Sequence, residues 1–319
     1  MAVYTDLSDE ELAVLLARYD LGAPLAFKGI AEGVTNSNFL LETEKGRFIL
    51  TIYEKRFERA ELPFFMDVME LLSEHAFPAP RPIHARDGAT INEVRGKPCA
   101  IVSFLNGISP RKPSVAQCRT AGEALAWMHT ALSGFTGHRA NGLGPSAWPT
   151  LVRPHLDVAH GLRAGLGDSA AADLDTLARV WPSDLPRGVI HADLFPDNVL
   201  LMGDTLGGVI DFYFACVDFL AYDVAVALNA WCFEPRGMFN LTKGAALLAG
   251  YESVRPLTPE EREALPILAR GAAMRFFGTR LHDWTERHDG ALVQRKDPLE
   301  YADKLDFHRR ARNAQDYGA

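Results

Sequence analysis

The chain has 319 residues, of which 48% are hydrophobic and 23% are charged. This is the composition of a soluble globular protein large enough for two hydrophobic cores. The formal net charge of −8, with no block of lysines and arginines, argues against nucleic acid as a partner. No apolar run approaches the ~18 residues of a membrane span, and residues 1–20 lack the pattern of a signal peptide. We therefore expect a cytoplasmic protein without a membrane partner.

The four cysteines also favour a reducing compartment. Cys99, Cys118, Cys216 and Cys232 are far apart in the sequence and form no C-x-x-C pair. We expect them to be reduced, buried thiols rather than disulfides or a zinc site. The sequence leaves the oligomeric state open between a monomer and a weak dimer.

In chain order, the first part of the sequence favours a small sheet with two helices. Residues 5–19 predict a helix, because Thr5 or Ser8 can cap it and acidic residues fill its first turn. A second, amphipathic helix is expected at residues 60–77. Strands are predicted where β-branched and aromatic residues gather: residues 25–31, 38–44, 46–54 and 97–105.

Beyond a linker at residues 106–113, helical periodicity dominates. Helices are expected at residues 114–132, 155–166, 171–181, 220–233, 241–254 and 261–284. The predicted fold class is therefore α+β and two-lobed. A small antiparallel-sheet N-lobe spans residues 1–106, and a larger, mainly helical C-lobe spans residues 107–319.

The helices of the C-lobe are interrupted by the stretch "VIHADLFPDNVLL", which places several polar groups among apolar residues. His191, Asp193 and Asn198 have the spacing H-x-D-x-x-x-x-N. Residues 199–212 then predict two short strands joined by a Gly/Asp turn. This hairpin ends at Asp211, which follows Asn198 by thirteen residues.

Phosphoryl transfer needs this set of groups. A carboxylate at Asp193 can orient an attacking hydroxyl and accept its proton, while Asn198 and Asp211 can hold Mg²⁺ on nucleotide phosphates. A hairpin places such groups rigidly around the transferred phosphoryl. Taken alone, Asp193 could be a helix cap or a surface acid, but the full spacing followed by a hairpin favours catalysis. Asp197 is expected to be a solvated loop acid.

These motifs resemble those of the protein-kinase-like superfold, in the branch with aminoglycoside phosphotransferases and choline kinases. "HADLFPDN" resembles the catalytic loop of that branch and "VIDF" its metal-binding segment. Stretches such as "GVTNSNFLL", "GLGPSAWP" and "DFLAYDVAVALNAWC" extend the likeness over most of residues 1–310, where the chain is most similar to the bacterial homoserine kinases of this fold. The resemblance implies ATP and Mg²⁺ as cofactors, L-homoserine as the small-molecule substrate and a role in threonine biosynthesis.

The resemblance also implies roles for individual residues. His191 is expected to buttress the catalytic loop, and Asp218 and Asp223 to brace it rather than bind metal. Residues 102–107 are expected to be the hinge whose backbone reads the adenine edge. The nucleotide-binding residues implied in this way are Gly33, Thr35, Asn36, Ser37, Asn38, Ile49, Thr51, Ser103 and Leu105.

One strand departs from the general kinase pattern. Thr51 stands where kinases place a lysine, and Met66 stands about where the glutamate partner of that lysine falls. Losing both together is physically coherent, because either one buried alone would be an unpaired charge. The group that neutralises the α- and β-phosphates stays open, and the candidates are Arg47, Lys55 and Arg56.

Substrate selection is expected from the C-terminal helices. The carboxylate of homoserine calls for a cation, for which we predict Arg280, with Arg275 as the next candidate. Asp283 lies at i+3 from Arg280 and could orient it or meet the ammonium group. Tyr213 and Trp231 could form the wall of the pocket. The alternatives are a surface ion pair for the charged residues and core packing for the two aromatic residues.

Two rival functions remain open at this point. One is a kinase for another small alcohol, such as choline, methylthioribose or an aminoglycoside. Choline and aminoglycosides are cations that need clustered acids or an aromatic cage, and the C-terminal helices are not notably rich in acids. The other is a nucleotide-binding pseudokinase. The missing lysine favours a pseudokinase weakly, and the intact Asp193, Asn198 and Asp211 argue against it.

Overall fold

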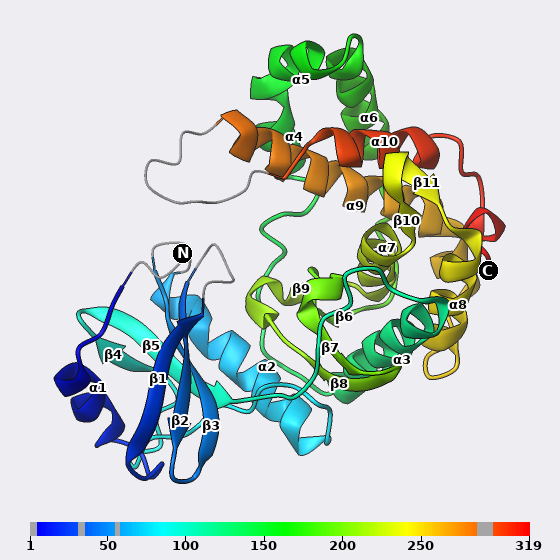
Figure 1. The fold of residues 1–319 in the computed structure, drawn as a ribbon. Coiled ribbons are helices and arrows are strands. Elements are labelled where there is room, and N and C mark those ends of the chain that lie inside the picture. The colour runs from blue at the N-terminus through cyan, green and yellow to red at the C-terminus, as the bar shows by residue number, and fades with distance from the viewer. Residues whose placement is uncertain (1–4, 31–35, 55–57, 286–295) are drawn as a thin grey trace. The chain divides into compact units, whose positions relative to one another are not determined.

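The computed structural model describes residues 5–30, 36–54, 58–285 and 296–319 (Figure 1). Over these residues the chain divides into two compact units, one ending at Asn106 and the other starting at Gly107. We call them unit 1 and unit 2. Unit 1 contains a five-stranded sheet, whereas unit 2 is mainly helical. The predicted fold class is therefore confirmed.

The sheet of unit 1 has the strand order β1-β2-β3-β5-β4, and all neighbouring strands are antiparallel. Its strands are β1 Pro24–Ile30, β2 Ser37–Thr43, β3 Gly46–Ile52, β4 Asn92–Val94 and β5 Lys97–Ser103. The four longer strands were predicted. The three-residue strand β4 was not, since so short a segment shows no alternation.

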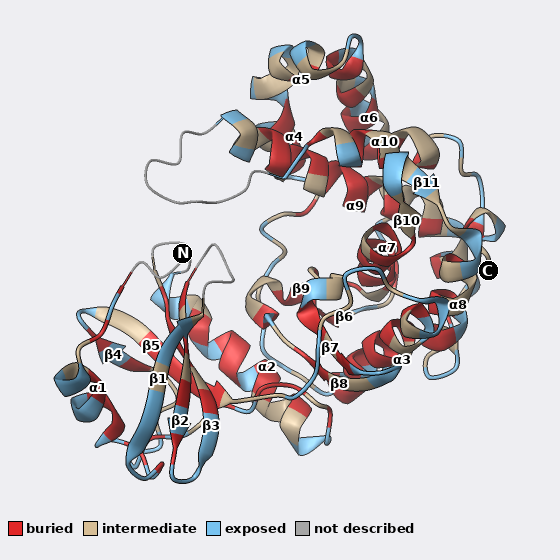
Figure 2. Cartoon of the chain, in the orientation of Figure 1, coloured by how far each residue is buried: buried red, intermediate tan, exposed pale blue. Residues whose placement is uncertain are grey.

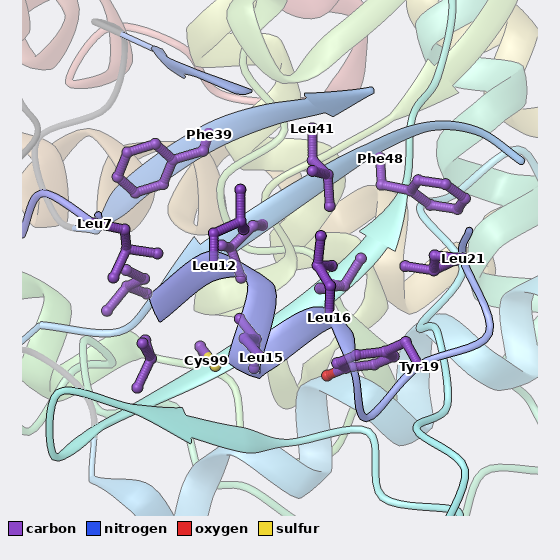
Figure 3. Packing of buried hydrophobic residues seen from close by; sticks show 14 of the residues in the cluster. Leu7, Leu12, Leu15, Leu16, Tyr19, Leu21, Phe39, Leu41, Phe48 and Cys99 are labelled. Atoms are coloured by element: carbon purple, nitrogen blue, oxygen red, sulfur yellow. The ribbon is translucent and has the colours of Figure 1, made fainter. Parts of the chain in front are cut away.

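Helix α1, Asp9–Leu16, lies against one face of this sheet. The Ser8 hydroxyl accepts a hydrogen bond from the Glu11 N–H, and the Glu11 carboxylate accepts one from the Ser8 N–H, which is a capping box. Figure 3 shows the leucines of the helix packed with Phe39 and Phe48 of the sheet. The predicted helix is confirmed, with its cap at the second of the two candidate positions.

The second helix of unit 1, α2, runs from Leu62 to Glu74 beside the sheet (Figure 1). Its buried residues recur at helical spacing and include Phe65 and Met66. The prediction at residues 60–77 is therefore confirmed with slightly shorter bounds.

Unit 2 is built around a deeply buried helix. The helices are α3 Val115–Ala131, α4 Trp148–Val152, α5 Leu156–Leu162, α6 Leu166–Val180, α7 Leu220–Trp231, α8 Leu241–Glu252, α9 Pro259–Thr285 and α10 Leu299–His308. Helix α7 is buried along nearly its whole length (Figure 2) and packs against α3, α8 and α9. Among the described helices, none is long and apolar enough to cross a membrane.

Three short hairpins or strand pairs complete unit 2. Strand β6, Arg187–Ile190, pairs with β9, Cys216–Phe219, and β7, Val199–Met202, pairs with β8, Thr205–Val209. The third pair joins β10 and β11, which have two residues each. The β7–β8 hairpin was predicted, whereas β6, β9, β10 and β11 were not.

Candidate active site

The loop between β6 and β7 carries two of the predicted catalytic residues. Asp193 is half-buried and Asn198 is buried. The Asn198 side-chain Nδ2 donates to the backbone carbonyl of Asp193 at 2.8 Å and to its carboxylate Oδ2 at 3.2 Å. These bonds close the loop over five residues and orient the amide oxygen of Asn198 away from Asp193.

The β7–β8 hairpin brings Asp211 back to the same loop. The Ile210 N–H donates to the Asn198 carbonyl at 2.9 Å, directly beyond the paired residues Val199 and Val209. Asp211 itself is exposed and lies in the left-handed region, with φ 64°. Asp193, Asn198 and Asp211 thus belong to one hydrogen-bonded region, as the spacing in the sequence predicts.

His191 links the loop to the hairpin from the inside. Its Nδ1 accepts from the Asp193 N–H at 3.2 Å, so its Nε2 carries the proton and donates to the Ile210 carbonyl at 3.0 Å. Burial lowers the pKa of His191, which keeps the ring neutral in this pair of bonds. The structural role implied for His191 is confirmed by these contacts.

Asp223 in α7 holds the loop backbone. Its carboxylate accepts from the N–H groups of His191 at 2.6 Å and Ala192 at 2.8 Å, and from Nε2 of His129 at 3.1 Å. Burial alone would raise the pKa of Asp223, but the hydrogen bond from His129 holds it below its usual value. The bracing role is confirmed for Asp223, whereas Asp218 accepts from the Asn141 side chain at 2.8 Å.

Arg275 in α9 contacts the same loop at the carbonyl of Ala192, whereas Asp223 contacts the N–H of that residue. Its guanidinium donates to the carbonyl of Ala192 and lies over the rings of Phe276 and Phe214, at 4.5 and 5.6 Å from their centroids. Arg275 is 1% exposed. Arg275, which was predicted to bind the substrate, therefore contacts the backbone of the catalytic loop in this structure.

Arg280, the first choice for the substrate carboxylate, is paired within the protein. It donates to Glu300 at 2.6 Å and to the carbonyl of Asp297 at 3.1 Å, and lies 4.5 Å from the ring centroid of Tyr301. Arg280 is buried, whereas Asp283 is exposed. The two residues therefore do not share an environment, and their joint role in binding substrate stays a prediction.

The two predicted aromatic residues differ in position. Trp231 is buried, and its Nε1 donates to the carbonyl of Leu194 at 2.8 Å, so it supports the catalytic loop. Tyr213 is half-buried and follows Asp211 in the chain. Of the two, only Tyr213 has an exposed part that a ligand could touch.

Lys296 lies near the site but belongs to no sequence motif. Burial raises the pKa of Asp193, and the charges of Arg275 and Lys296 act in the opposite direction. Lys296 is exposed, and its Nζ lies 5.7 Å from the ring centroid of Phe195. The sequence prediction missed Lys296 because it lies about a hundred residues from the loop, with no pattern linking the two.

In unit 1, three of the predicted nucleotide-binding residues share one face of the sheet. Asn38 pairs with Thr51 across β2 and β3, and Ile49 lies two residues along the same strand. Because side chains alternate along a strand, these three point away from the face that α1 covers. The Thr51 hydroxyl donates to Oδ1 of Asn38 at 2.8 Å. The face therefore carries a polar pair beside an aliphatic residue.

The other predicted nucleotide residues are already in contact with protein groups or lie outside the described residues. Ser37 donates to Glu54 at 2.7 Å, Asn36 accepts from the N–H of Glu54 at 3.4 Å, and the Ser103 hydroxyl accepts from the Arg81 N–H at 2.9 Å. Leu105 is half-buried. The residues outside the described part of the chain are Gly33, Thr35, Lys55 and Arg56.

Arg47 was one candidate for neutralising the phosphates. Its guanidinium donates to the side-chain oxygen of Asn106 at 2.8 Å and lies 4.4 Å from the ring centroid of Phe104. It therefore contacts the end of the segment predicted to be the hinge. This position makes Arg47 a neighbour of the hinge rather than of Thr51.

A divalent cation fits the donor set at Asn198 and Asp211. Within the described residues, no three His, Cys, Asp or Glu side chains gather as a metal cluster. A magnesium ion does not need one, because it keeps several waters and takes one or two protein oxygens plus substrate phosphates. Asn198 offers an amide oxygen and Asp211 an exposed carboxylate, both hard oxygen ligands.

Comparison of the sequence with known proteins identifies its family. Residues 26–257, well over half of the chain, match the phosphotransferase enzyme family. The chain belongs to the phosphotransferase enzyme family. It is 59% identical to a homoserine kinase of Phenylobacterium zucineum over 319 residues, covering 100% of this chain and 99% of that protein. A homoserine kinase of Caulobacter vibrioides is 59% identical over 310 residues, covering 97% of this chain and 98% of its own.

A solved structure extends the comparison to the fold of the family. Amicoumacin kinase, determined with AMP-PNP, Ca²⁺ and amicoumacin, aligns with a TM-score of 0.68 and covers 95% of this chain and 92% of its own. Its sequence identity is 15%. At that identity the similarity shows the fold alone, which agrees with the sheet of unit 1 and the helices of unit 2.

Proposed function

We propose that this chain transfers the γ-phosphoryl group of ATP to the hydroxyl of L-homoserine, giving O-phospho-L-homoserine on the route to threonine. The observation that carries the proposal is full-length identity of 59% to proteins named homoserine kinase. The arrangement of Asp193, Asn198 and Asp211 in one hydrogen-bonded region supports it, because phosphoryl transfer needs a base and two metal ligands together.

In the proposed reaction Asp193 is the base. The hydroxyl oxygen of homoserine forms a new bond to the γ-phosphorus, the bond from that phosphorus to the β,γ-bridging oxygen breaks, and ADP leaves with the bonding electrons. The hydroxyl proton passes to the Asp193 carboxylate. The Asn198 side chain orients that carboxylate by donating to its Oδ2 atom. Asp223 accepts from the N–H groups of His191 and Ala192, and Arg275 donates to the carbonyl of Ala192, so the loop backbone is held from both sides.

Mg²⁺, when bound, neutralises charge on the β- and γ-phosphates. In this proposal Asp211 and the amide oxygen of Asn198 hold the ion. Two protein ligands suit Mg²⁺, since the phosphates and water supply the remaining oxygens.

We assign ATP binding to residues of unit 1. Ile49 lies beside the adenine, the backbone around Ser103 and Leu105 reads its edge, and Thr51 with Asn38 faces the phosphates. We also assign phosphate contacts to Asn36 and Ser37, and to Gly33 and Thr35, which lie outside the described residues. This assignment rests on the shared sheet face of Asn38, Ile49 and Thr51.

We further propose that the enzyme acts in the cytoplasm as a monomer or weak dimer. Support for the location comes from the four cysteines, all of which are free and buried, as is usual for proteins of reducing compartments.

The test is a comparison of acceptors in an assay that measures ADP release. L-Homoserine, choline, methylthioribose and an aminoglycoside are each supplied with Mg·ATP, and a reaction without acceptor is the control. We expect L-homoserine to exceed the others in kcat/KM by about 10²-fold or more, because a site built to pair charged groups rejects analogues that lack them. The product is identified by phosphorus NMR. A higher kcat/KM for another acceptor would overturn the proposal, and ATP binding without turnover would indicate a pseudokinase.

A further inference from the structure

The proposed substrate carries a carboxylate, which needs a cation close to the catalytic loop. Unit 2 has several cations in this region, and their partners decide which one can serve. Arg275 is buried and donates to the loop carbonyl of Ala192. The Arg275 guanidinium therefore already binds the loop backbone.

Arg280 and Lys304 share one acid. Arg280 donates to Oε2 of Glu300 at 2.6 Å, and Lys304 donates to Oε1 at 2.8 Å. Lys304 also donates to the carbonyl of Asn229 at 3.0 Å and is buried. Both cations have partners that a substrate carboxylate would have to displace.

Lys296 differs from these cations. It is exposed, and within the described part of the chain it forms no ion pair with a carboxylate. Its Nζ lies 5.7 Å from the ring centroid of Phe195, and the Phe195 N–H donates to the carbonyl of Asp193 at 2.7 Å.

The residue that follows Lys296 is bonded to two helices. The Asp297 carbonyl accepts from Arg280 at 3.1 Å, and the Asp297 carboxylate accepts from the Leu299 N–H at 2.9 Å. The backbone next to Lys296 is thus tied to α9 on one side and to the start of α10 on the other. The backbone from which the Lys296 side chain extends is therefore anchored on its C-terminal side, so less backbone order is lost when an anion binds there.

We propose that Lys296 binds the carboxylate of the substrate and thereby selects a hydroxy amino acid over a simple amino alcohol. In this arrangement Arg280 is a positioning residue, which acts on the substrate through Asp297 and not by direct contact. Three aromatic rings lie between Lys296 and Arg280. Lys296 lies beside Phe195 and Arg280 beside Tyr301. Phe276 lies between these two rings, with centroid distances of 4.9 Å to Phe195 and 5.2 Å to Tyr301. The inference rests on the proposed function and names the group that recognises its substrate.

The experiment compares two acceptors that differ only in the carboxylate, L-homoserine and 3-aminopropan-1-ol. Lys296→Met removes the charge and keeps the length of the side chain. We expect the KM for L-homoserine to rise about ten- to a hundredfold, the usual range for losing a hydrogen bond to a charged group. kcat and the KM for ATP should change little. The kcat/KM for 3-aminopropan-1-ol should stay at the wild-type value.

Three further variants make the result specific. Lys296→Arg should recover most of the affinity for L-homoserine. Lys112→Met, which removes an exposed lysine elsewhere in unit 2, should behave as wild type. Arg280→Met should lower the melting temperature as well as raise the KM, because it removes the bonds of a buried guanidinium to Glu300 and to the Asp297 carbonyl, whereas Lys296→Met should leave the melting temperature unchanged.

Each outcome decides between the two proposals. If wild type prefers L-homoserine and Lys296→Met retains that preference over 3-aminopropan-1-ol, the role of Lys296 is wrong and the proposed function stands. If wild type uses 3-aminopropan-1-ol as well as L-homoserine, it does not recognise a carboxylate, and both proposals fail.

Discussion

Asp193 carries the proposed proton transfer, and a single substitution can isolate that step. In Asp193→Asn, the amide oxygen can still accept from the Asn198 side chain, as Oδ2 does now at 3.2 Å. We therefore expect folding and ADP binding to be nearly unchanged, while kcat falls by about 10²–10⁴, the usual contribution of a positioned base. Steady-state kinetics and calorimetry with ADP measure the two effects.

The matched control is Asp197→Asn, which neutralises an exposed acid of the same loop. Its kcat should stay close to that of wild type. Near-normal turnover in Asp193→Asn would remove this residue from the mechanism.

Asp211 is expected to act through the metal. Its backbone has φ 64°, a conformation that asparagine tolerates well, so Asp211→Asn removes the charge with little strain. We expect turnover to be lost and Mg·ATP binding to weaken. Of the two proposed ligands, Asp211 is the charged one, so the substitution leaves the ion with neutral protein ligands. ATP binding in the presence of a chelator should change much less. Calorimetry showing equal losses with and without Mg²⁺ would contradict a metal role.

The residues of the catalytic loop could be predicted from sequence because they lie close together along the chain. Asp193, Asn198 and Asp211 fall within nineteen residues, and their spacing is the signal. Arg275 and Lys296 could not be assigned in this way. Each meets the loop only after about eighty to a hundred residues of intervening chain have folded, and a lone cation on a helix or in a loop has no spacing to reveal it.

At the scale of elements, helices α7 and α9 hold one peptide of the loop between them. Asp223 accepts from the Ala192 N–H, and Arg275 donates to the Ala192 carbonyl. Arg275→Met should therefore lower the free energy of unfolding by about 1.5–3 kcal/mol, the range for a hydrogen bond to a charged group, and reduce kcat as well. Urea unfolding and kinetics measure both.

Arg119→Met on the exposed side of α3 is the control for a general loss of charge. Among the described residues, the Arg119 side chain makes one ion pair, the exposed i,i+4 pair with Glu123, so its loss should change stability by less than about 0.5 kcal/mol. If Arg275→Met were as stable as this control, the bond to Ala192 would contribute nothing.

The link between α9 and α10 predicts a pH dependence. Burial alone would raise the pKa of Glu300, but the charges of Lys304 and Arg280 hold it at about 2. A depressed pKa gives stability that is complete above the unfolded value, near 4.5, and is lost as the pH falls from there toward 2. Glu300→Gln should therefore be less stable than wild type at pH 7, with a smaller difference at pH 4.

Urea unfolding at pH 7, 5 and 4 checks this expectation. Glu263→Gln, at an exposed position of α9, should follow wild type at each pH. A constant difference between Glu300→Gln and wild type across the series would show that the ion pairs do not produce the effect.

The elements missed in the sequence lack a visible period, for two different reasons. Helix α10 places Tyr301, Ala302 and Leu305 among charged residues and also buries Lys304. A buried lysine breaks the apolar stripe by which an amphipathic helix is found. Its burial depends on Glu300 and on the Asn229 carbonyl, and the latter contact comes from a distant helix. The pairs of two-residue strands are likewise too short to show a period.

For the whole molecule, the change from sheet to helix along the chain was visible in local periodicity. The strand order β1-β2-β3-β5-β4 keeps most sequence neighbours adjacent, which local patterns favour. The residue that would recognise the carboxylate of the substrate was less accessible from the sequence than the family was. In our proposal that residue is the cation left without an ion pair after folding, and no spacing rule distinguishes Lys296 from Arg280, which has partners.

The backbone of Ala192 has a consequence for any attempt to move this loop into another protein. Ala192 lies in the left-handed region, with φ 63°, where an alanine is intrinsically disfavoured. Its conformation is imposed by helices α7 and α9, which come later in the chain. A peptide of residues 189–212 would therefore relax to a different shape. A designer who grafts the D-x-x-x-x-N sequence onto a new scaffold must also supply a buried acid for the N–H and a buried cation for the carbonyl.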